Sequence, residues 1–319
     1  MELRRFNLLI QTRNKKPQEQ WEWPIAVDLY IAGIGGGSFI TGVVVDWLGY
    51  SVFPSKAILL WGALLTVFAI PFIIMDLGKK WRFLYACLNP RTSWLSRGFL
   101  ILSAFILVGI AALIVSLLPL LDIRITPIVL RVLESIGVIL AFATAVYSGL
   151  LFKAVRYVTF WDTWLLPVLF IISALSGGMM VIILSISGAS LFAHEGNPNH
   201  LMELLISVEL ALLVAEGVVL SLFLILRYRI KELGKYSVRV LLSGHLKFVF
   251  WIGSIVSHFL IPIILLSLYS SRLPYMLFVA GFFLLLGGLL FRLAIVRAGI
   301  KRPHPLLGLI EILNSGGNA

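Results

Sequence analysis

The feature that most constrains this chain is a long apolar stretch between Trp21 and Trp47 that contains an acidic residue and several glycines. About 20 apolar residues in a helix, each rising about 1.5 Å, cross the ~30 Å hydrocarbon core of a bilayer. A carboxylate at that depth, here Asp28, costs on the order of 2.5 to 3.5 kcal/mol unless it faces a bundle interior or a polar cavity. The glycines at 33 and 35–37 permit close approach of another helix. The stretch is therefore predicted to be both the packing centre of a helical bundle and the wall of a site.

The rest of the chain has the composition of a membrane protein. Hydrophobic residues make up 60% and charged residues 13%, with a mean hydropathy of +1.02, against about 45 to 50% and 25% in soluble domains. Long apolar runs predict helices, because a barrel shows short alternating segments. We predict an all-α integral membrane protein with eight transmembrane helices, inserted through its first span because no signal peptide precedes it. The expected spans are residues 24–46, 55–75, 98–118, 128–152, 163–187, 202–226, 246–269 and 274–297.

The spans are expected to form two packed four-helix bundles. The first is assigned to residues 24–152 and the second to residues 153–297, with a polar basic segment at residues 1–23 and a C-terminal tail at residues 298–319. The first and fifth spans share a short echo, Ile31-Ala-Gly-Ile-Gly-Gly-Gly-Ser-Phe against Ile172-Ser-Ala-Leu-Ser-Gly-Gly-Met-Met. Small residues at matching depth fit two bundles packed against each other.

An even number of spans places both termini on one side of the membrane, here called the near side. Of the 26 Lys and Arg residues, all but Lys56, Arg124, Arg131 and Arg272 fall on that side. The positive-inside rule then predicts a plasma-membrane protein with cytoplasmic termini. The alternative is that the basic face is a docking surface for an acidic partner, selected for charge independently of topology. Membrane lipid is an expected partner and nucleic acid is not.

Four polar residues lie near one level on the near side, with a fifth in the loop above them. Following the up-and-down path, Asp28, Asp76, Tyr147 and Arg292 come from four different spans, with Arg82 in the loop above them. A carboxylate, a phenol and a guanidinium suit a polar head group whose apolar tail lies in lipid, and a quinone fits this description. Other interpretations stay open: Asp76 and Arg292 as snorkelling helix ends, Tyr147 as an interfacial aromatic, and an Asp28–Arg292 ion pair that orders the bundle.

A second set of polar residues lies deeper. Glu209 and Glu216 are two turns apart on one helix face, His258 is at mid-depth in the seventh span, and Glu134 begins the fourth span on the far side. The set is predicted to relay protons toward the head-group pocket. Alternatively, it is a set of buried hydrogen bonds that holds helices together.

Several classes of site are excluded by residue counts. The single cysteine, Cys87, rules out an internal disulfide and a four-cysteine iron–sulfur cluster. Only one of the five histidines lies deep in a span, so a bis-histidine di-haem site cannot form. No catalytic residues and no metal site are predicted.

Several segments match, in order, a known family. They are Trp23 with Gly33-Ile-Gly-Gly-Gly; Asp76-Leu-Gly with Arg82-Phe and Leu88-Asn-Pro-Arg-Thr-Ser-Trp; Tyr147-Ser-Gly-Leu-Leu; Phe170-Ile-Ile-Ser-Ala-Leu-Ser-Gly-Gly; Gly244 with Phe250-Trp and Pro262; and Arg292 with Val296-Arg-Ala-Gly. Together they cover nearly the whole chain and resemble the polysulfide reductase membrane-subunit family, the NrfD/PsrC type. The Asp-Leu-Gly loop and the Tyr-Ser-Gly-Leu-Leu helix end are the most specific matches.

The resemblance implies two four-helix bundles that bind a quinone such as menaquinone as substrate and carry no haem or iron–sulfur cluster of their own. It implies a ferredoxin-like iron–sulfur subunit and a molybdopterin catalytic subunit as partners, docked on the basic near side. It also places Asp28 and Tyr147 at the quinone head group, with an acid here where some members have histidine. In well-known members the termini face outside the cell, opposite to the orientation that the charge distribution predicts.

The leading functional prediction is a quinone-binding anchor that exchanges electrons between the quinone pool and a partner in a respiratory, anaerobic oxidoreductase, with possible proton translocation. The alternative is a secondary transporter or ion-conducting protein, whose path Asp28, Glu209, Glu216 and His258 would line. Against the alternative, the spans do not show paired broken helices at the midplane.

Overall fold

The computed structural model describes residues 23–50, 60–76, 94–123, 126–155, 158–193, 199–230, 232–269, 273 and 275–299, and every regular element in them is helical. These elements are α2 (Trp23–Trp47), α4 (Gly62–Val67), α5 (Ile70–Asp76), α7 (Trp94–Leu117), the 3₁₀-helix η2 (Leu118–Leu121), α8 (Pro127–Ala154), α9 (Leu165–Ala193), α10 (Asn199–Ile230), α11 (Glu232–Leu242), the π-helix η3 (Val249–Leu260), α12 (Ile261–Ser267) and α13 (Tyr275–Arg297). Seven helices in this part of the chain are long and apolar enough to cross a membrane. The all-helical, multi-pass membrane class is therefore confirmed.

The second expected span is a broken pair of short helices, α4 and α5, instead of one long helix. Pro71 lies near the start of α5. Proline lacks an N–H, and its ring clashes with the carbonyl four residues earlier, so a helix is interrupted before it. The pair lies antiparallel to α2, because Gly62 packs against Phe39 while the Phe72 ring packs edge-on against Trp23, with 6.2 Å between the ring centroids. Seven of the eight expected spans are thus found, and a crossing by the α4–α5 pair stays a prediction.

Helix α2 is the packing centre that its glycines predicted. Gly37 faces Gly178 of α9 so closely that a Cβ on Gly178 would lie 2.6 Å from the Gly37 Cα. One turn earlier, a Cβ on Gly33 would meet Ala174 of α9 at 3.3 Å. Gly36, next to Gly37, faces α8 instead, where a Cβ would lie 2.8 Å from the backbone oxygen of Ala141. The two echoing glycine segments therefore contact each other, and α2 and α9 run parallel because later residues of one meet later residues of the other.

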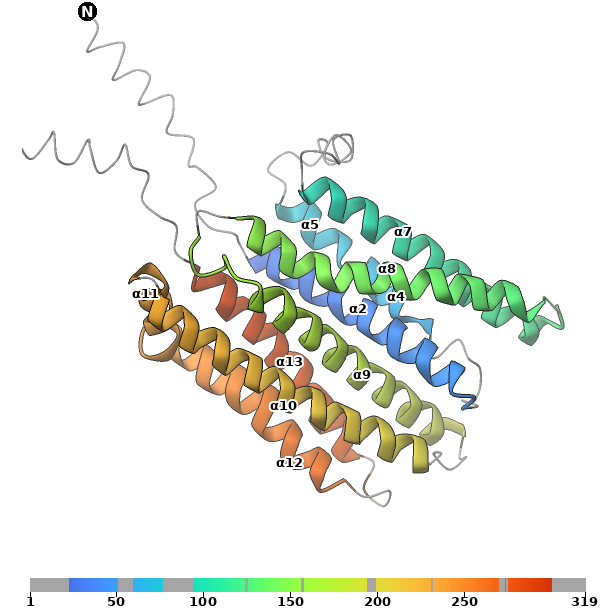
Figure 1. The fold of residues 1–319 in the computed structure, drawn as a ribbon. Helices are drawn as coiled ribbons and strands as arrows, with labels where there is room; N and C mark the ends of the chain where they lie inside the picture. The colour runs from blue at the N-terminus through green and yellow to red at the C-terminus, as the bar shows by residue number, and fades with distance from the viewer. Residues whose placement is uncertain are drawn as a thin grey trace, which may run out of the picture.

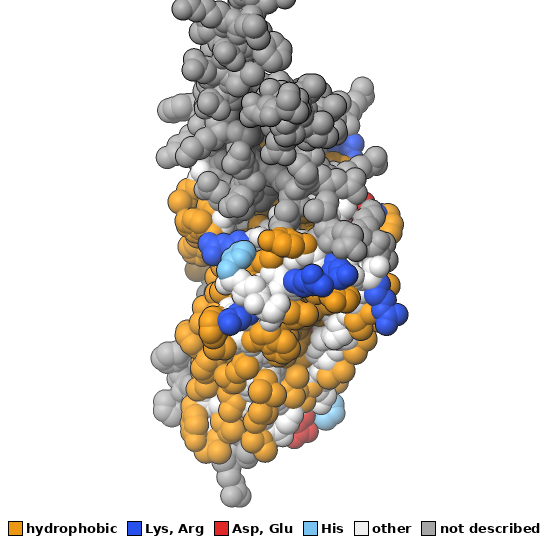
Figure 2. All heavy atoms as spheres, turned by 90° about the vertical axis from the view of Figure 1, so that its left-hand side faces the viewer, with side chains coloured by type: hydrophobic (Ala, Val, Ile, Leu, Met, Phe, Trp, Pro, Cys, Tyr) orange, Lys and Arg blue, Asp and Glu red, His pale blue; other side chains and the backbone are white. Residues whose placement is uncertain are grey.

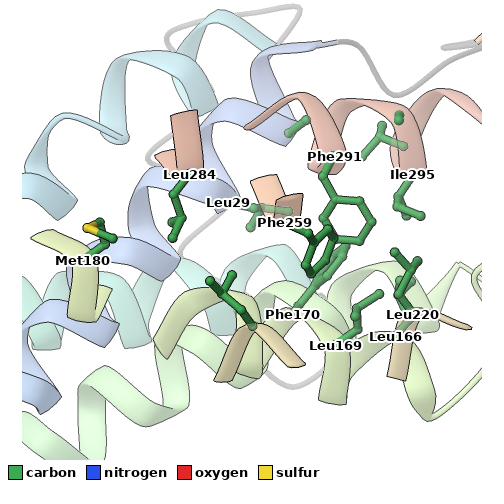
Figure 3. Close-up of a cluster of buried hydrophobic side chains, with 14 of the residues drawn as sticks. Leu29, Leu166, Leu169, Phe170, Met180, Leu220, Phe259, Leu284, Phe291 and Ile295 are labelled. Carbon is green, nitrogen blue, oxygen red and sulfur yellow. The ribbon is translucent and has the colours of Figure 1, made fainter. Parts of the chain in front are cut away.

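The helices lie side by side in two neighbouring groups, α2, α4, α5, α7 and α8 in one and α9 to α13 in the other (Figure 1). A hydrophobic core joins the groups: one cluster of buried side chains includes Leu29 of α2, Phe170 of α9, Leu220 of α10, Phe259 of η3 and Phe291 of α13 (Figure 3). The division into bundles at residues 24–152 and 153–297 stays a prediction. The predicted terminal segments lie almost entirely outside the described residues.

Positive side chains gather at the end of the molecule that carries α11. Figure 2 shows Lys and Arg side chains there, next to a surface that is mostly hydrophobic. Several of these cations lie over aromatic rings, including Lys235 over Tyr228 and Lys247 over Phe248. Amphipathic aromatic and cationic side chains in this combination are typical of a membrane–water interface.

Candidate functional site

A small cavity lies between α2, α5, α7 and α8. Its volume is about 30 Å³, which is space for about two water molecules. Its walls are apolar except for a carboxylate, a phenol and a serine. The lining residues are Asp28, Ile70, Gly98, Phe99, Leu102, Ser103, Ile106 and Tyr147. The structure therefore brings together two of the residues predicted to hold a head group, Asp28 and Tyr147.

The Tyr147 ring is positioned by a missing side chain. Gly98 of α7 packs directly under the ring, and a Cβ at that position would collide with the ring carbons and the hydroxyl oxygen. Tyr147 is 4% exposed, and its hydroxyl makes no hydrogen bond to any described residue. Asp28 is 2% exposed. A phenol donates a hydrogen bond and a carboxylate accepts a proton. Together the two groups can hold a ligand by a hydrogen bond and take a proton from it.

Arg292 lies behind the cavity and not in its lining. Its Nη1 donates to the Ser148 hydroxyl over 3.4 Å, and its guanidinium lies 3.6 Å from the centroid of the Phe170 ring. Ser148 is the neighbour of Tyr147 in α8. Arg292 therefore lies at the predicted level, where it contacts α8 and α9 beside the residues that line the cavity.

The other two predicted head-group residues are less fully described. Asp76 ends α5, and only its backbone is described. Arg82 lies outside the described residues. Their role at the cavity stays a prediction.

A second polar group, here called the Glu–His cluster, lies between α10, η3, α13, α9 and α2. It consists of Tyr30, Ser176, Glu209, Glu216 and His258. Its centre is the contact of His258 Nε2 with Glu216 Oε2 at 3.1 Å, and His258 Nδ1 lies 2.8 Å from the carbonyl oxygen of Leu284. Glu216 and His258 are almost fully buried. Two of the predicted relay residues are therefore in direct contact.

The other members of the Glu–His cluster complete this interior. The Ser176 hydroxyl donates to Glu209 Oε1 over 2.6 Å, and the Tyr30 hydroxyl donates to the Leu285 carbonyl over 2.6 Å. Gly288 has no side chain where the Tyr30 hydroxyl and the His258 ring meet; a Cβ there would lie 2.6 Å from the first and 3.1 Å from the second. Sequence reasoning missed Tyr30 and Ser176, although Tyr30 is only two residues from Asp28.

The backbone under His258 is unusual. The Ser254 and Ser257 hydroxyls donate to carbonyls five residues earlier, at 3.3 Å and 2.9 Å, as the wide turn of η3 allows. Pro262 follows at the start of α12 and cannot donate to that ladder. π-type turns occur frequently at functional sites.

Glu134 lies apart from the Glu–His cluster. Its Oε2 accepts from Trp47 Nε1 over 2.8 Å and from Arg131 Nη1 over 3.3 Å. Arg131 also lies 3.0 Å from Asp46 Oδ2. These residues join the C-terminal end of α2 to the first turns of α8, which is the far-side end. The structure therefore does not bring Glu134 to the other three predicted relay residues.

The chain is similar to a family of membrane subunits over most of its length. The family model described as polysulphide reductase, NrfD, matches residues 11–304. A polypeptide of the polysulfide reductase of Wolinella succinogenes is 26% identical over 265 residues, which covers 77% of this chain and 82% of that protein. Protein NrfD of Escherichia coli is 27% identical over 314 residues, or 88% and 94%. One subunit of the selenate reductase of Mesobacillus selenatarsenatis is 27% identical over 183 residues, or 55% and 41%. The family match includes the cavity and the Glu–His cluster.

Proposed function

We propose, since the chain belongs to the polysulphide reductase NrfD family, that it binds a quinone at the cavity between α2, α5, α7 and α8 and exchanges electrons between the quinone pool and an iron–sulfur subunit. Two relatives are named as single polypeptides of a polysulfide reductase and of a selenate reductase, which implies that each belongs to a larger oxidoreductase. These names support a membrane anchor within such a complex. A ferredoxin-like iron–sulfur subunit and a molybdopterin subunit are its proposed partners.

The observation that carries the proposal is the chemistry of the cavity wall. Asp28 and Tyr147 face an otherwise largely apolar space, and both lie within helices long and apolar enough to cross a membrane. A quinol has two hydroxyl groups on an apolar ring, so a phenol that donates to one oxygen and a carboxylate that accepts from the other match it. In the proposed reaction Tyr147 donates a hydrogen bond to one oxygen. Quinol oxidation releases two electrons, which pass to the iron–sulfur subunit, and two protons, of which Asp28 accepts one and water accepts the other. In the opposite direction the quinone takes up two electrons and two protons, one of them from the protonated Asp28 carboxyl group.

The cavity is too small to hold a quinone ring without opening. Pockets for ligands of this kind are typically about 300 to 1,000 Å³, whereas the cavity measures about 30 Å³. Ring entry therefore requires the wall to open. We propose that it opens on the side of the short helix α5 and of α7, which contributes side chains such as Phe99 and Ile106. The oxygen-binding residues, Asp28 and Tyr147, belong to α2 and α8.

The near-side cations support docking of an acidic partner at the end nearest the cavity. Electrostatic complementarity speeds and orients association. By the positive-inside rule, the same charges place this end in the cytoplasm. Charges selected for docking can lie on either side of the membrane, so the partners bind either in the cytoplasm or outside the cell. A protease-protection assay on a tag at either terminus separates the two orientations.

Binding of a fluorescent alkyl-hydroxyquinoline N-oxide, a quinol analogue, to the purified complex tests the site. Asp28→Asn and Tyr147→Phe are each expected to weaken binding tenfold or more, and tenfold corresponds to about 1.4 kcal/mol. Tyr50→Phe is the matched control, since Tyr50 bonds to His200 at the far end, 3.0 Å away. It is expected to bind like the wild type.

Unchanged binding in both cavity variants would remove this cavity as the quinone site. Failure of the wild-type complex to bind the analogue would remove the quinone function itself. The transporter alternative then becomes the one to test, by measuring ion flux into liposomes without quinone.

A further inference from the structure

The Glu–His cluster has no part in the quinone cavity. Successive residues of a helix are rotated by about 100°, so Asp28 and Tyr30 point to nearly opposite sides of α2. Asp28 lines the cavity, whereas the Tyr30 hydroxyl reaches the Leu285 carbonyl of α13. Helix α2 is therefore the wall between two separate buried polar sites.

The hydrogen bonds of His258 fix how many protons the Glu216–His258 contact holds. A backbone carbonyl only accepts, so Nδ1, 2.8 Å from the Leu284 oxygen, must carry a hydrogen. The contact of Nε2 with Glu216 Oε2 at 3.1 Å then requires one further proton, on either the imidazole or the carboxyl group. In both arrangements the pair is neutral. Gain or loss of one proton gives a net charge to a pair whose side chains are at most 1% exposed.

Charged and titratable groups face the pair from three neighbouring helices. Tyr30 comes from α2 and Glu209 from α10, two turns from Glu216 on the same face. Arg292 comes from α13, one turn after Gly288, which touches the His258 ring. Its guanidinium also lies against α2, since a Cβ on Gly33 would be 3.9 Å from Arg292 Nη2. The same guanidinium reaches Ser148, beside Tyr147 of the cavity.

The cluster also retains unused hydrogen-bonding capacity. Glu209 Oε2, Glu216 Oε1, and Arg292 Nε and Nη2 are buried and have no hydrogen-bond partner among the described residues. Buried polar atoms in folded proteins are nearly always bonded to protein or to ordered water.

We propose that the Glu216–His258 pair is a proton-exchange site, which shares one proton between His258 Nε2 and Glu216 Oε2 at rest and gains or loses one when the charge at the cavity changes. Arg292 transmits this change, because it lies one turn from Gly288, which packs against the His258 ring, and its guanidinium bonds to Ser148 beside Tyr147. Ionisable residues inside a membrane are expensive and are retained where they act. A static contact between α10 and η3 needs none, since apolar residues of similar size pack helices at least as well.

The proton site itself is tested without any quinone. Infrared difference spectra of the purified complex, recorded as the pH is changed, report carboxyl and imidazole protonation. The wild type is expected to show a carboxyl band and an imidazole band that titrate together. Both changes are expected to be lost in Glu216→Gln, whose amide keeps a hydrogen bond to His258 and so preserves the fold. Glu203→Gln, an exposed change on the same helix, is the control and keeps both bands. Identical titrating bands in the wild type and Glu216→Gln would overturn the proposal.

The coupling to the cavity rests on the proposed function and has its own measurement. Calorimetry of analogue binding in two buffers of different ionisation enthalpy gives the number of protons exchanged. Glu216→Gln is expected to bind the analogue and to exchange fewer protons than the wild type, by up to about one. An unchanged proton count refutes the coupling. If even the wild type fails to bind, the quinone function fails, and the infrared titration still decides whether the proton site exists.

Discussion

The contact of Gly37 with Gly178 gives the sharpest prediction about stability. A Cβ added at Gly178 would lie 2.6 Å from the Gly37 Cα, whereas ordinary contact begins at 3.4 Å. The atoms that it meets belong to backbone, so no rotamer change can relieve the overlap. The carbonyl carbon of Gly37 and the nitrogen of Ser38 lie nearer still, so Gly178→Ala forces α2 and α9 apart by at least about 0.8 Å, the difference between these two distances.

The expected loss follows from the dependence of helix association on close packing. Hydrocarbon surrounds these helices, so there is little hydrophobic gain in bringing them together, and dispersion contacts carry the association. A gap of 0.5 to 1 Å forfeits about a quarter to a half of each contact energy, and overpacking in tight interiors costs about 1 to 3 kcal/mol. Gly178→Ala is expected to lower the thermal midpoint of the purified protein by on the order of 5 °C.

Gly188→Ala is the matched control. Gly188 lies on the same helix as Gly178, and a Cβ there would meet nothing within 4 Å. It is expected to be neutral or slightly stabilising, because alanine favours a helix over glycine by about 0.5 to 1 kcal/mol. Fluorescence-detected melting in one detergent compares the variants. Equal midpoints for Gly178→Ala and the wild type would refute the argument that this contact sets the spacing of α2 and α9.

Two further substitutions test other parts of the structure. Gly98→Ala places a methyl group against the Tyr147 ring. It is expected to weaken analogue binding at least tenfold, with Gly188→Ala as the control. Wild-type affinity of Gly98→Ala for the analogue would contradict the assigned ring position. Arg131→Met removes the cation from two buried carboxylates at the far-side end. The free energy of unfolding is expected to fall by about 1 to 3 kcal/mol. This is less than the 3 to 5 kcal/mol of a fully buried pair, because Arg131 is half-exposed. Arg229→Met, at an exposed position, is its control in the same melting assay, and equal midpoints for the two variants would show that the ion pairs contribute nothing.

Much of the architecture follows from the sequence because the bilayer restricts the possibilities. A run of sufficient length and hydropathy has few options other than a spanning helix, and seven such helices are found in the described residues. The glycine echo also gave a real contact, because small residues are where membrane helices approach each other. The break between α4 and α5 was missed because hydropathy counts Pro71 as part of an apolar run, whereas the backbone loses a donor there.

Side-chain partners were harder to predict than depth. Asp28 and Tyr147 reach one cavity, as their levels indicated, but the position of Arg292 behind Tyr147 depends on the rotation of α13. Glu134 was assigned to the correct end, yet its partners Trp47 and Arg131 depend on how α2 and α8 pack. The sequence carries no local signal for such rotations, since a helix face is defined only once its neighbours are placed.

The location of α2 extends the Gly178→Ala prediction from stability to function. A shift of α2 away from α9 moves it toward α4, because Gly35, on the opposite side of α2 from Gly37, faces Gly62 and Thr66 of α4. Asp28 moves with α2, and the cavity that it lines has only about 30 Å³ to lose. The same shift draws Tyr30 away from the Leu285 carbonyl, now 2.6 Å distant. We therefore expect Gly178→Ala to weaken analogue binding and to alter the proton count on binding, although it touches neither site. A variant that melts early but binds the analogue and exchanges protons as the wild type does would show that α2 moves as a rigid wall, with the two sites independent of its spacing from α9.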